Sequence, residues 1–380
     1  MGRGRNVFVC GLCIILLLSS CATLRSFRRE PRGERLERIK ASPNWKDGRF
    51  RNVSGEVDPD EPGWFPYTFT LLTIGGKARP SCPIPCVRTD LHSLGRERDC
   101  IIWFGHASVF LQLGGVRWLM DPVFTNVFPQ RMLLRPFKGT VVYTPDDIPE
   151  IDVLLISHCH WDHLDYFTVT AIKERVGKVV CPLGVGEYFE FWGYPKEKIV
   201  ELDWEDSFEI PSREGRCAAS VKALPAVHNS RRFSAQDRTL WMSAIIETPS
   251  ASLPRVFISG DGGWGQHFTD IARRFSPIDL AIMENGQYGE CGGSVHSRPE
   301  ELVREIETLS PRIVMTYHNG KYSLAKHSWS EPLDLAYEYA QSSGRMLLTP
   351  EIGEPVFPGS GSYPVSPWWR DLACYKRVDK

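Results

Sequence analysis

The sequence predicts an α/β fold in which two β-sheets pack together and helices cover their outer faces. Short apolar runs of strand type recur along the chain, the first ones follow one another like a hairpin, and helical patterns separate several later ones. This order, first hairpin-like and then alternating, occurs twice. The runs span residues 100–105, 108–113, 116–121, 152–157, 178–182, 221–226, 240–247, 255–261, 280–285, 312–318 and 345–350.

Turn and helix signals lie between these runs. GGV at 114–116 is typical of a hairpin turn. Helices are predicted at 165–177 and 185–193, which both end in glycine, a residue favoured just after a helix. A third is predicted at 298–310, where a proline and acidic residues occupy the first turn.

Composition describes an ordinary globular chain. The 380 residues allow one large domain or two of usual size. With 45 basic and 46 acidic residues the net charge is −1, so no nucleic-acid partner is expected. We expect one folded domain over 64–380. The segment 21–63 is rich in Arg, Glu, Pro and Gly, which predicts a flexible basic tether, either against anionic head groups or simply solvated.

The first residues differ from the rest of the chain. Basic MGRGR precedes the apolar run VFVCGLCIILLL and the small residues SSCA, the layout of a secretory signal. Leu18-Ser19-Ser20-Cys21 resembles the lipobox of bacterial lipoproteins. We therefore expect a signal peptide over 1–20, lipidation of Cys21, and a membrane-anchored lipoprotein of the cell envelope, periplasmic or on the outer surface. An ordinary signal or an uncleaved anchor is the alternative.

Eight further cysteines have irregular spacing. In an exported protein a disulfide from Cys86 to Cys82 or to Cys100 is one interpretation. The spacing predicts no framework.

The strongest chemical signal is SHCHWDHLD at 157–165, directly behind a buried run. Further candidate ligands stand at or just beyond the ends of other runs, where α/β folds place their sites. The full set is His158, His160, Asp162, His163, His228, Asp261 and His318.

The spacing predicts two neighbouring metal positions. Along an extended segment His158 and His160 point to the same side, so both can meet one ion together with His228. Where the chain turns into a helix, Asp162 and His163 point to a second position, shared with His318. Asp261 is expected to bridge. Imidazole and carboxylate ligands suit Zn²⁺ first, with Mn²⁺ or Fe as alternatives. Two such ions support hydrolysis.

Other residues in and near the motif are expected to be structural. Cys159 and Trp161 should face away from the ligands and pack. His92 and His267 are expected to be ordinary core or surface histidines.

These motifs carry a resemblance to a known family. SHCHWDHLD, PAVHNSRR, SGDGG and YHNG resemble the metallo-β-lactamase fold hydrolases. Within them, WFGHASVFLQL, LMDPVF, ELDW, GGSVHSRPEE and KHSWSEP are similar to the N-acylphosphatidylethanolamine-hydrolysing phospholipase D branch. The likeness covers about residues 64 to 350.

The resemblance implies a four-layer αββα sandwich with two zinc ions on the ligands named above. It also implies a metal-bridging hydroxide that attacks a phosphodiester, with Asp162 and Asp261 in catalytic positions. A lipid substrate would release an N-acylethanolamine and leave phosphatidic acid. His296 matches a family histidine near the site, with substrate contact or support as its role and a helix flank as the alternative. His106 and Asp121 match positions that orient metal ligands, with packing as the alternative.

Other functions remain open at the level of the sequence. The match is weaker at NSRRFSAQDR and WMSAIIE, so the acyl and head-group preference is not determined. A metal-dependent lactonase or ester hydrolase on a soluble, sugar-phosphate-like substrate is the runner-up. A nuclease comes third, because the processing nucleases of this superfamily carry a large inserted domain and the spacing from Asp261 to His318 leaves no room for one. A non-catalytic, metal-stabilised envelope lipoprotein is the alternative from a different class. Several aromatic residues either line an acyl groove or belong to the core: Trp64, Phe65, Phe191, Trp192, Trp368 and Trp369.

Overall fold

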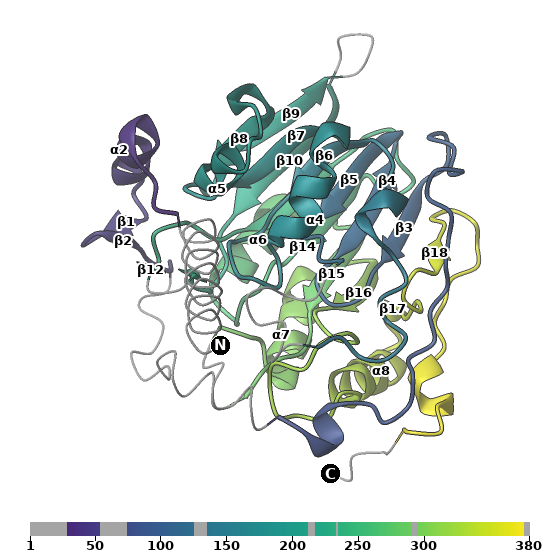
Figure 1. The fold of residues 1–380 in the computed structure, drawn as a ribbon. Coiled ribbons are helices and arrows are strands. Elements are labelled where there is room, and N and C mark those ends of the chain that lie inside the picture. The colour runs from purple at the N-terminus through teal and green to yellow at the C-terminus, as the bar shows by residue number, and fades with distance from the viewer. Residues whose placement is uncertain are drawn as a thin grey trace, which may run out of the picture.

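The computed structural model describes residues 29–53, 74–124, 135–211, 217–232, 235–289 and 295–375. Within these ranges two seven-stranded sheets pack face to face and helices cover both outer faces (Figure 1). The expected four-layer αββα sandwich is confirmed. The predicted signal peptide over 1–20, Cys21, Trp64 and Phe65 lie outside the described residues.

The first sheet combines an antiparallel half with a parallel half. Strand β18 pairs antiparallel with β3, and the hairpin-like strands β3 to β5 are antiparallel, whereas β5 to β8 are parallel. Its strands in spatial order are β18 (Pro355–Val356), β3 (Cys100–Trp103), β4 (Val109–Leu113), β5 (Val116–Met120), β6 (Ile151–Leu155), β7 (Val176–Pro182) and β8 (Ile199–Leu202).

The second sheet repeats this plan. Strands β9, β10, β13 and β14 are antiparallel neighbours, and β14 to β17 are parallel. Its strands in spatial order are β17 (Met346–Leu348), β16 (Ile313–Tyr317), β15 (Leu280–Glu284), β14 (Arg255–Ile258), β13 (Ser243–Glu247), β10 (Cys217–Leu224) and β9 (Ser207–Pro211). All eleven predicted runs therefore lie on strands. Three strands of the two sheets were not predicted: β8, β9 and the two-residue β18. Strand β9 lies at the edge of its sheet, and its residues are all at least partly exposed.

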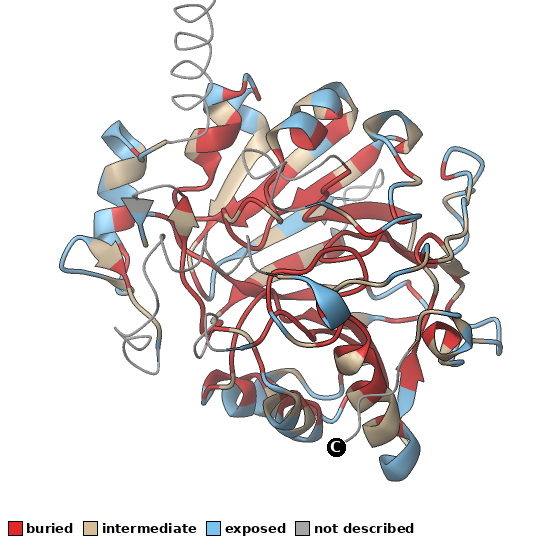
Figure 2. Ribbon diagram, turned by 60° about the horizontal axis from the view of Figure 1, so that its bottom comes forward, coloured by how far each residue is buried: buried red, intermediate tan, exposed pale blue. Residues whose placement is uncertain are grey.

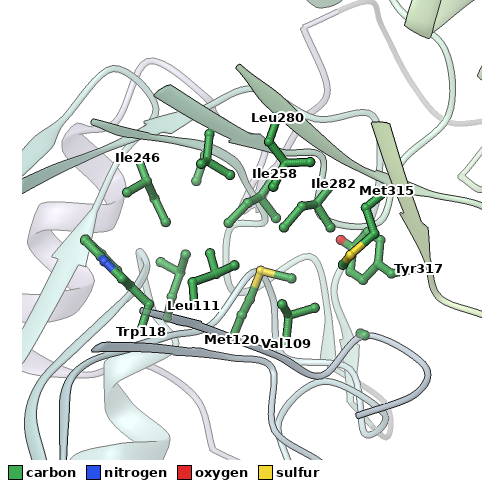
Figure 3. Packing of buried hydrophobic residues seen from close by; sticks show 14 of the residues in the cluster. Val109, Leu111, Trp118, Met120, Ile246, Ile258, Leu280, Ile282, Met315 and Tyr317 are labelled. Carbon is green, nitrogen blue, oxygen red and sulfur yellow. The ribbon is translucent and has the colours of Figure 1, made fainter. Parts of the chain in front are cut away.

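The main core lies between the sheets. Alternate side chains of each strand face the opposite sheet, because successive residues of a strand point to opposite sides. Figure 3 shows this contact for Val109, Leu111, Trp118 and Met120 on one side and Ile246, Ile258, Leu280, Ile282, Met315 and Tyr317 on the other. The strands are largely buried, and the outer helices expose one side (Figure 2).

Two smaller apolar clusters attach the helices to the outer faces. Helices α4 (Tyr166–Ala171) and α5 (Gly186–Phe191) pack on the first sheet. The second sheet is covered by α6 (His267–Phe275), α7 (Pro299–Leu309) and α8 (Glu331–Ser343). Short 3-10 turns are η1 (Gly76–Ala78), η2 (Pro145–Asp147), η3 (Lys173–Arg175), η4 (Lys196–Lys198) and η5 (Trp368–Asp371).

The predicted helix over 165–177 is wrong at its C-terminal end. Helix α4 ends at Ala171, and Gly177 belongs to strand β7. A Cβ atom on Gly177 would lie 2.8 Å from the backbone oxygen of Asp152 on the neighbouring strand, so this glycine permits close strand packing and does not end a helix. The helices predicted at 185–193 and 298–310 are confirmed as α5 and α7. The hairpin turn at 114–116 is also confirmed, with positive φ at Gly114 and Gly115.

The expected tether over 21–63 is wrong for residues 29–53. This stretch, called the N-terminal arm below, forms helix α2 (Gly33–Ala41) and a hairpin of β1 (Trp45–Lys46) and β2 (Arg49–Phe50). Ile39 and Phe50 are buried in the main core cluster. The few apolar residues of the segment pack against the domain, which average composition does not show.

The disulfide lies where the sequence analysis did not place one. Cys82 is bonded to Cys374, 292 residues away along the chain. Cys86 and Cys100 are free thiols, so both suggested pairings with Cys86 are wrong. Among the described residues no helix has the length and apolar character needed to cross a membrane.

Candidate metal centre

The candidate site lies where parallel strands of both sheets end. Asp121 follows β5 directly, the HCHWDH segment begins three residues after β6, and Asp261 stands three residues after β14. Glu284 is the last residue of β15, and His318 follows β16. Because the carboxyl ends of parallel strands meet at one edge, all these side chains converge.

Three imidazoles form a first group, called the histidine cluster: His158, His160 and His228. Nε2 of His158 lies 2.9 Å from Nδ1 of His160, and Nε2 of His228 lies 3.2 Å and 3.1 Å from those two atoms. Ligand atoms arranged tetrahedrally about 2.0–2.1 Å from one zinc ion are about 3.3 Å apart. The three nitrogens therefore fit one divalent cation.

Asp162, His163 and His318 form a second group, called the mixed cluster. The Nε2 atoms of His163 and His318 are 3.2 Å apart, and Oδ2 of Asp162 lies 3.7 Å and 3.5 Å from them. These separations also suit the donor atoms of one cation.

Asp261 stands between the two clusters. Its Oδ2 lies 3.1 Å from Nε2 of His163, 3.0 Å from Nε2 of His318 and 4.0 Å from Nε2 of His158. The structure therefore brings all seven predicted ligands together, with Asp261 in the central place.

The outer nitrogens of four of the histidines face acceptors. Nδ1 of His163 lies 2.9 Å from a carboxylate oxygen of Asp121, and Nδ1 of His228 lies 3.0 Å from the carbonyl oxygen of Val295. Nδ1 of His158 lies 2.9 Å from the hydroxyl of Ser157, and Nδ1 of His318 lies 3.2 Å from Glu284. The first three partners hold the proton on the outer nitrogen and leave the inner lone pair for a metal, whereas the contact of His318 with Glu284 is an ion-pair distance without hydrogen-bond geometry.

His106 and Asp121, expected near the ligands, both contact them. Nε2 of His106 lies 2.7 Å from Oδ2 of Asp162. Asp121 is fully buried and also accepts hydrogen bonds from the backbone and hydroxyl of Ser157. His106, Asp121 and His318 all adopt positive φ values, of 53°, 40° and 67°, a conformation that costs energy for residues other than glycine and is concentrated at functional sites.

Glu284 was missed by the sequence analysis. Its Oε1 accepts a hydrogen bond of 2.6 Å from Nδ1 of His296, and the same oxygen faces His318. The available signal was its place at the end of the apolar run LAIME, the same kind of position as that of His318. His296, predicted near the site, lies beside the clusters, with its ring stacked on that of His318.

Burial and charge act differently on the two clusters. Burial lowers the pKa of His158 and His228 well below the ordinary value, and neighbouring histidines lower it further. These imidazoles are therefore neutral. Burial also disfavours the charged form of His163, but Asp261 and Asp162 outweigh it and raise the pKa of His163 to about 10. Burial alone would raise the pKa of Asp162, yet His163 and His106 bring it well below its usual value.

The residues between the ligands pack as expected. Cys159 is buried in the cluster that attaches α4 and α5, and burial raises the pKa of its thiol. Trp161 packs under the guanidinium of Arg232, whose carbon lies 3.8 Å from the ring centre. The sequence analysis gave Arg232 no role, yet it is buried and donates hydrogen bonds to the carbonyl oxygens of Cys159 and Leu164, which brace the ligand segment.

Asp162 and His296 are partly exposed members of the site, as is His160. The side chains of Asp162 and His296 are 13% and 16% exposed, whereas those of His163 and His318 are fully buried. His92 is exposed and His267 is buried, as expected of ordinary histidines. Of the aromatic residues proposed for an acyl groove, Trp192, Trp368 and Trp369 are buried, and Phe191 is 43% exposed.

Comparison with known proteins identifies the family. A family model described as a beta-lactamase superfamily domain matches residues 116–319, more than half of the chain. The chain belongs to the metallo-β-lactamase superfamily. An uncharacterised protein of Mycobacterium tuberculosis is 32% identical over 342 residues, covering 87% of this chain and 88% of the relative.

Two further relatives of this superfamily member are named for a specific enzymatic activity. The N-acyl-phosphatidylethanolamine-hydrolyzing phospholipase D 1 of Caenorhabditis elegans is 28% identical, covering 66% of this chain and 74% of the relative. The mitochondrial enzyme of the same name from Saccharomyces cerevisiae is 26% identical, covering 77% of this chain and 64% of the relative.

Solved structures show the same fold. Igni18, a metallo hydrolase of Ignicoccus hospitalis, has a TM-score of 0.53 at 19% identity, with 68% of this chain and 97% of that chain covered. CmlA, a diiron β-hydroxylase of Streptomyces venezuelae, has a TM-score of 0.54 at 21% identity over 68% of this chain and 54% of that chain. The family assignment and the side-chain clusters support a metal-dependent hydrolase with a divalent metal site.

Proposed function

We propose that this metallo-β-lactamase superfamily member is a zinc-dependent phosphodiesterase of the phospholipase D type. Its substrate in this proposal is N-acylphosphatidylethanolamine or a related phospholipid, and hydrolysis yields an N-acylethanolamine and phosphatidic acid. The observation that carries the proposal is the convergence of two donor clusters on Asp261 in a chain related to proteins named for this reaction.

Two zinc ions are the proposed cofactors, with Mn²⁺ or Fe as alternatives. The histidine cluster would hold one ion and the mixed cluster the second, with Asp261 shared between them. When bound, such a pair supplies a hydroxide at neutral pH and stabilises charge on a phosphoryl oxygen.

His296 is the proposed substrate contact. Glu284 accepts a hydrogen bond from the Nδ1–H group of His296, so Nε2 is the nitrogen available to a substrate oxygen. Although burial lowers the pKa of His296, Glu284 outweighs burial and holds this pKa above its usual value. An N–H at Nε2 of this partly exposed imidazole suits an anionic phosphodiester or a departing alkoxide.

Membrane attachment through a lipidated Cys21 is part of the proposal. It is supported by the lipobox resemblance and by the lipid substrates in the relatives' names. An envelope lipoprotein would meet its phospholipid substrate in the membrane to which it is anchored. Mass spectrometry of the mature N-terminus tests this part, and an unmodified Cys21 in membrane-derived protein would contradict it.

The activity is tested with the full chain in detergent, loaded with Zn²⁺, Mn²⁺ or Fe²⁺ in parallel. Each preparation is incubated with a phospholipid extract containing N-acylphosphatidylethanolamine, and lipids are read by mass spectrometry. We expect paired phosphatidic acid and N-acylethanolamine with wild type and neither with Asp162→Asn. An unchanged lipid profile from protein that retains two ions would contradict the phospholipase proposal and direct the search to soluble esters and lactones.

A further inference from the structure

We propose that Asn52, carried by the N-terminal arm, is a positioning residue that fixes His228 in the histidine cluster. The inference rests on the proposed function, because it concerns His228 as a metal ligand. Asn52 stands outside every motif of the site and comes from a segment whose composition predicted a tether.

The Asn52 carboxamide binds both backbone polar groups of His228. Its Nδ2 donates a hydrogen bond of 2.8 Å to the carbonyl oxygen of His228, and its Oδ1 accepts one of 3.0 Å from the His228 backbone N–H. The same Oδ1 accepts a further hydrogen bond of 3.0 Å from the indole N–H of Trp241. These partners require the amide nitrogen on one side and the oxygen on the other, so the orientation of the carboxamide is determined.

His228 needs such a partner because it lies beyond its strand. Strand β10 ends at Leu224, four residues earlier, so its ladder supplies no hydrogen bond at His228. The residue is fully buried, and a buried backbone group without a partner is costly. The Asn52 carboxamide supplies the two backbone hydrogen bonds that a neighbouring strand would otherwise make with His228. The side chain is held separately by the contact of Nδ1 with the Val295 carbonyl oxygen.

The arm itself is firmly attached to the domain. The Arg35 guanidinium binds Glu201, Glu187 and Glu190, at 2.5, 2.8 and 3.1 Å. The backbone N–H of Phe50, two residues before Asn52, donates to the carbonyl oxygen of Asp237. Asn52 is therefore delivered to His228 by a segment ordered by its own contacts, the arrangement that a preorganised ligand requires.

If Asn52 only attached the arm to the domain, replacing any other residue that attaches the arm should have the same effect on the metal centre. The arm contains such a residue as a matched control. Asn44 belongs to the same arm, and its Nδ2 donates to Oδ1 of Asp203 at 3.1 Å, with no contact to the clusters. Loss of either asparagine weakens the arm. Only loss of Asn52 frees the His228 backbone.

The experiment compares full-length wild type, Asn52→Ala, Asn52→Asp and Asn44→Ala. Zinc retention is measured by competition with a chromophoric chelator, and the unfolding midpoint is measured on metal-free protein. We expect Asn52→Ala to weaken retention of one of the two ions about 10–100-fold, the usual effect of losing an outer partner of a metal ligand. Asn44→Ala should retain zinc like wild type, whatever its effect on the midpoint.

Asn52→Asp keeps the side-chain volume and the acceptor but loses the donor to the His228 carbonyl oxygen. It should also lose zinc retention, and it answers the question if Asn52→Ala does not fold. Wild-type retention in both Asn52 variants, or equal losses in Asn52→Ala and Asn44→Ala, would overturn the inference while leaving the metal centre in place. Wild-type protein that holds no ion would overturn the proposed function as well.

Discussion

The histidine cluster and the mixed cluster are adjacent, but the protein holds them in different ways. His228 is held mainly by main-chain groups and by the amide of Asn52. The mixed cluster is held by ionisable side chains: Asp121 behind His163, Glu284 behind His318, and His106 behind Asp162. Main-chain and amide partners fix the direction and tautomer of a ligand without adding a charge, whereas ionisable partners also bring a charge.

This difference implies separate sensitivities. A charge removed behind the mixed cluster changes both the geometry and the basicity of its ligands. A contact removed behind His228 changes the position of this ligand without removing a charge. Asp261 lies between the two clusters and contacts members of both, so this contrast does not apply to it.

The largest expected effect comes from the residue that both clusters share. Asp261→Asn should remove at least about a thousandfold of kcat/KM, because binuclear metal sites contribute several kcal/mol to transition-state stabilisation. Metal content should fall in the same variant. Asp279→Asn is the matched control, since Asp279 accepts from the backbone of Arg255 near the other end of β14. Two retained ions with full turnover in Asp261→Asn would contradict the bridging role.

Asp121→Asn is expected to affect metal retention by the mixed cluster more than by the histidine cluster. The change places an amide against Nδ1 of His163, so retention of the mixed-cluster ion should weaken about 10–100-fold. The other ion should be less affected, because Asp121 reaches His158 only through Ser157. Chelator titration resolves the two ions. Asp152→Asn, near the amino end of β6 and paired with Arg96, should change neither. Equal loss of both ions in Asp121→Asn would remove the distinction between the clusters.

Glu284→Gln tests charge behind His318 and His296 while preserving shape. A glutamine oxygen still accepts from His296 but no longer carries charge, so kcat should fall by about tenfold with two ions retained. The control is Glu305→Gln. Burial raises the pKa of Glu305 well above its ordinary value, which favours the neutral form that glutamine imitates. Unchanged kcat in Glu284→Gln would show that the shape and hydrogen bonding of Glu284 affect turnover and that its charge does not.

The smallest expected effect concerns the free energy of unfolding and comes from Lys321, which lies behind the mixed cluster. Its ammonium donates to the carbonyl oxygens of Phe104 and Val123, which flank the segments bearing His106 and Asp121. Burial lowers the pKa of Lys321 to about 8 from 10.5. Between these values the unfolded chain binds a proton that the folded chain does not, so this group adds stability as pH rises.

The measurement is urea unfolding of metal-free wild type and Lys321→Met from pH 7.5 to 9.5. The free energy of unfolding of wild type relative to the variant should rise with pH, by at most about 1.4 kcal/mol per pH unit. Parallel dependence on pH in the two proteins would show that Lys321 does not titrate in this range.

Much of the fold was readable because it depends on local pattern. Eleven strands, two of the three helices and the first hairpin followed from hydrophobic period and turn residues. Gly177 was misread because a glycine that ends a helix and a glycine that lets a neighbouring strand approach closely look alike in the sequence. The disulfide joins residues 292 positions apart, and no local spacing encodes such a pair.

By itself, the sequence determined the ligand chemistry. Histidine and aspartate at the ends of buried strands are rarely needed for packing, so residue type and position were sufficient to predict seven converging ligands. The tertiary structure decided what supports them. Glu284 and Asn52 are ordinary residues in the sequence, and they matter only because distant segments fold against His318 and His228. Hydrogen bonds between such segments depend on three-dimensional proximity, which the order of residues along a single chain does not reveal.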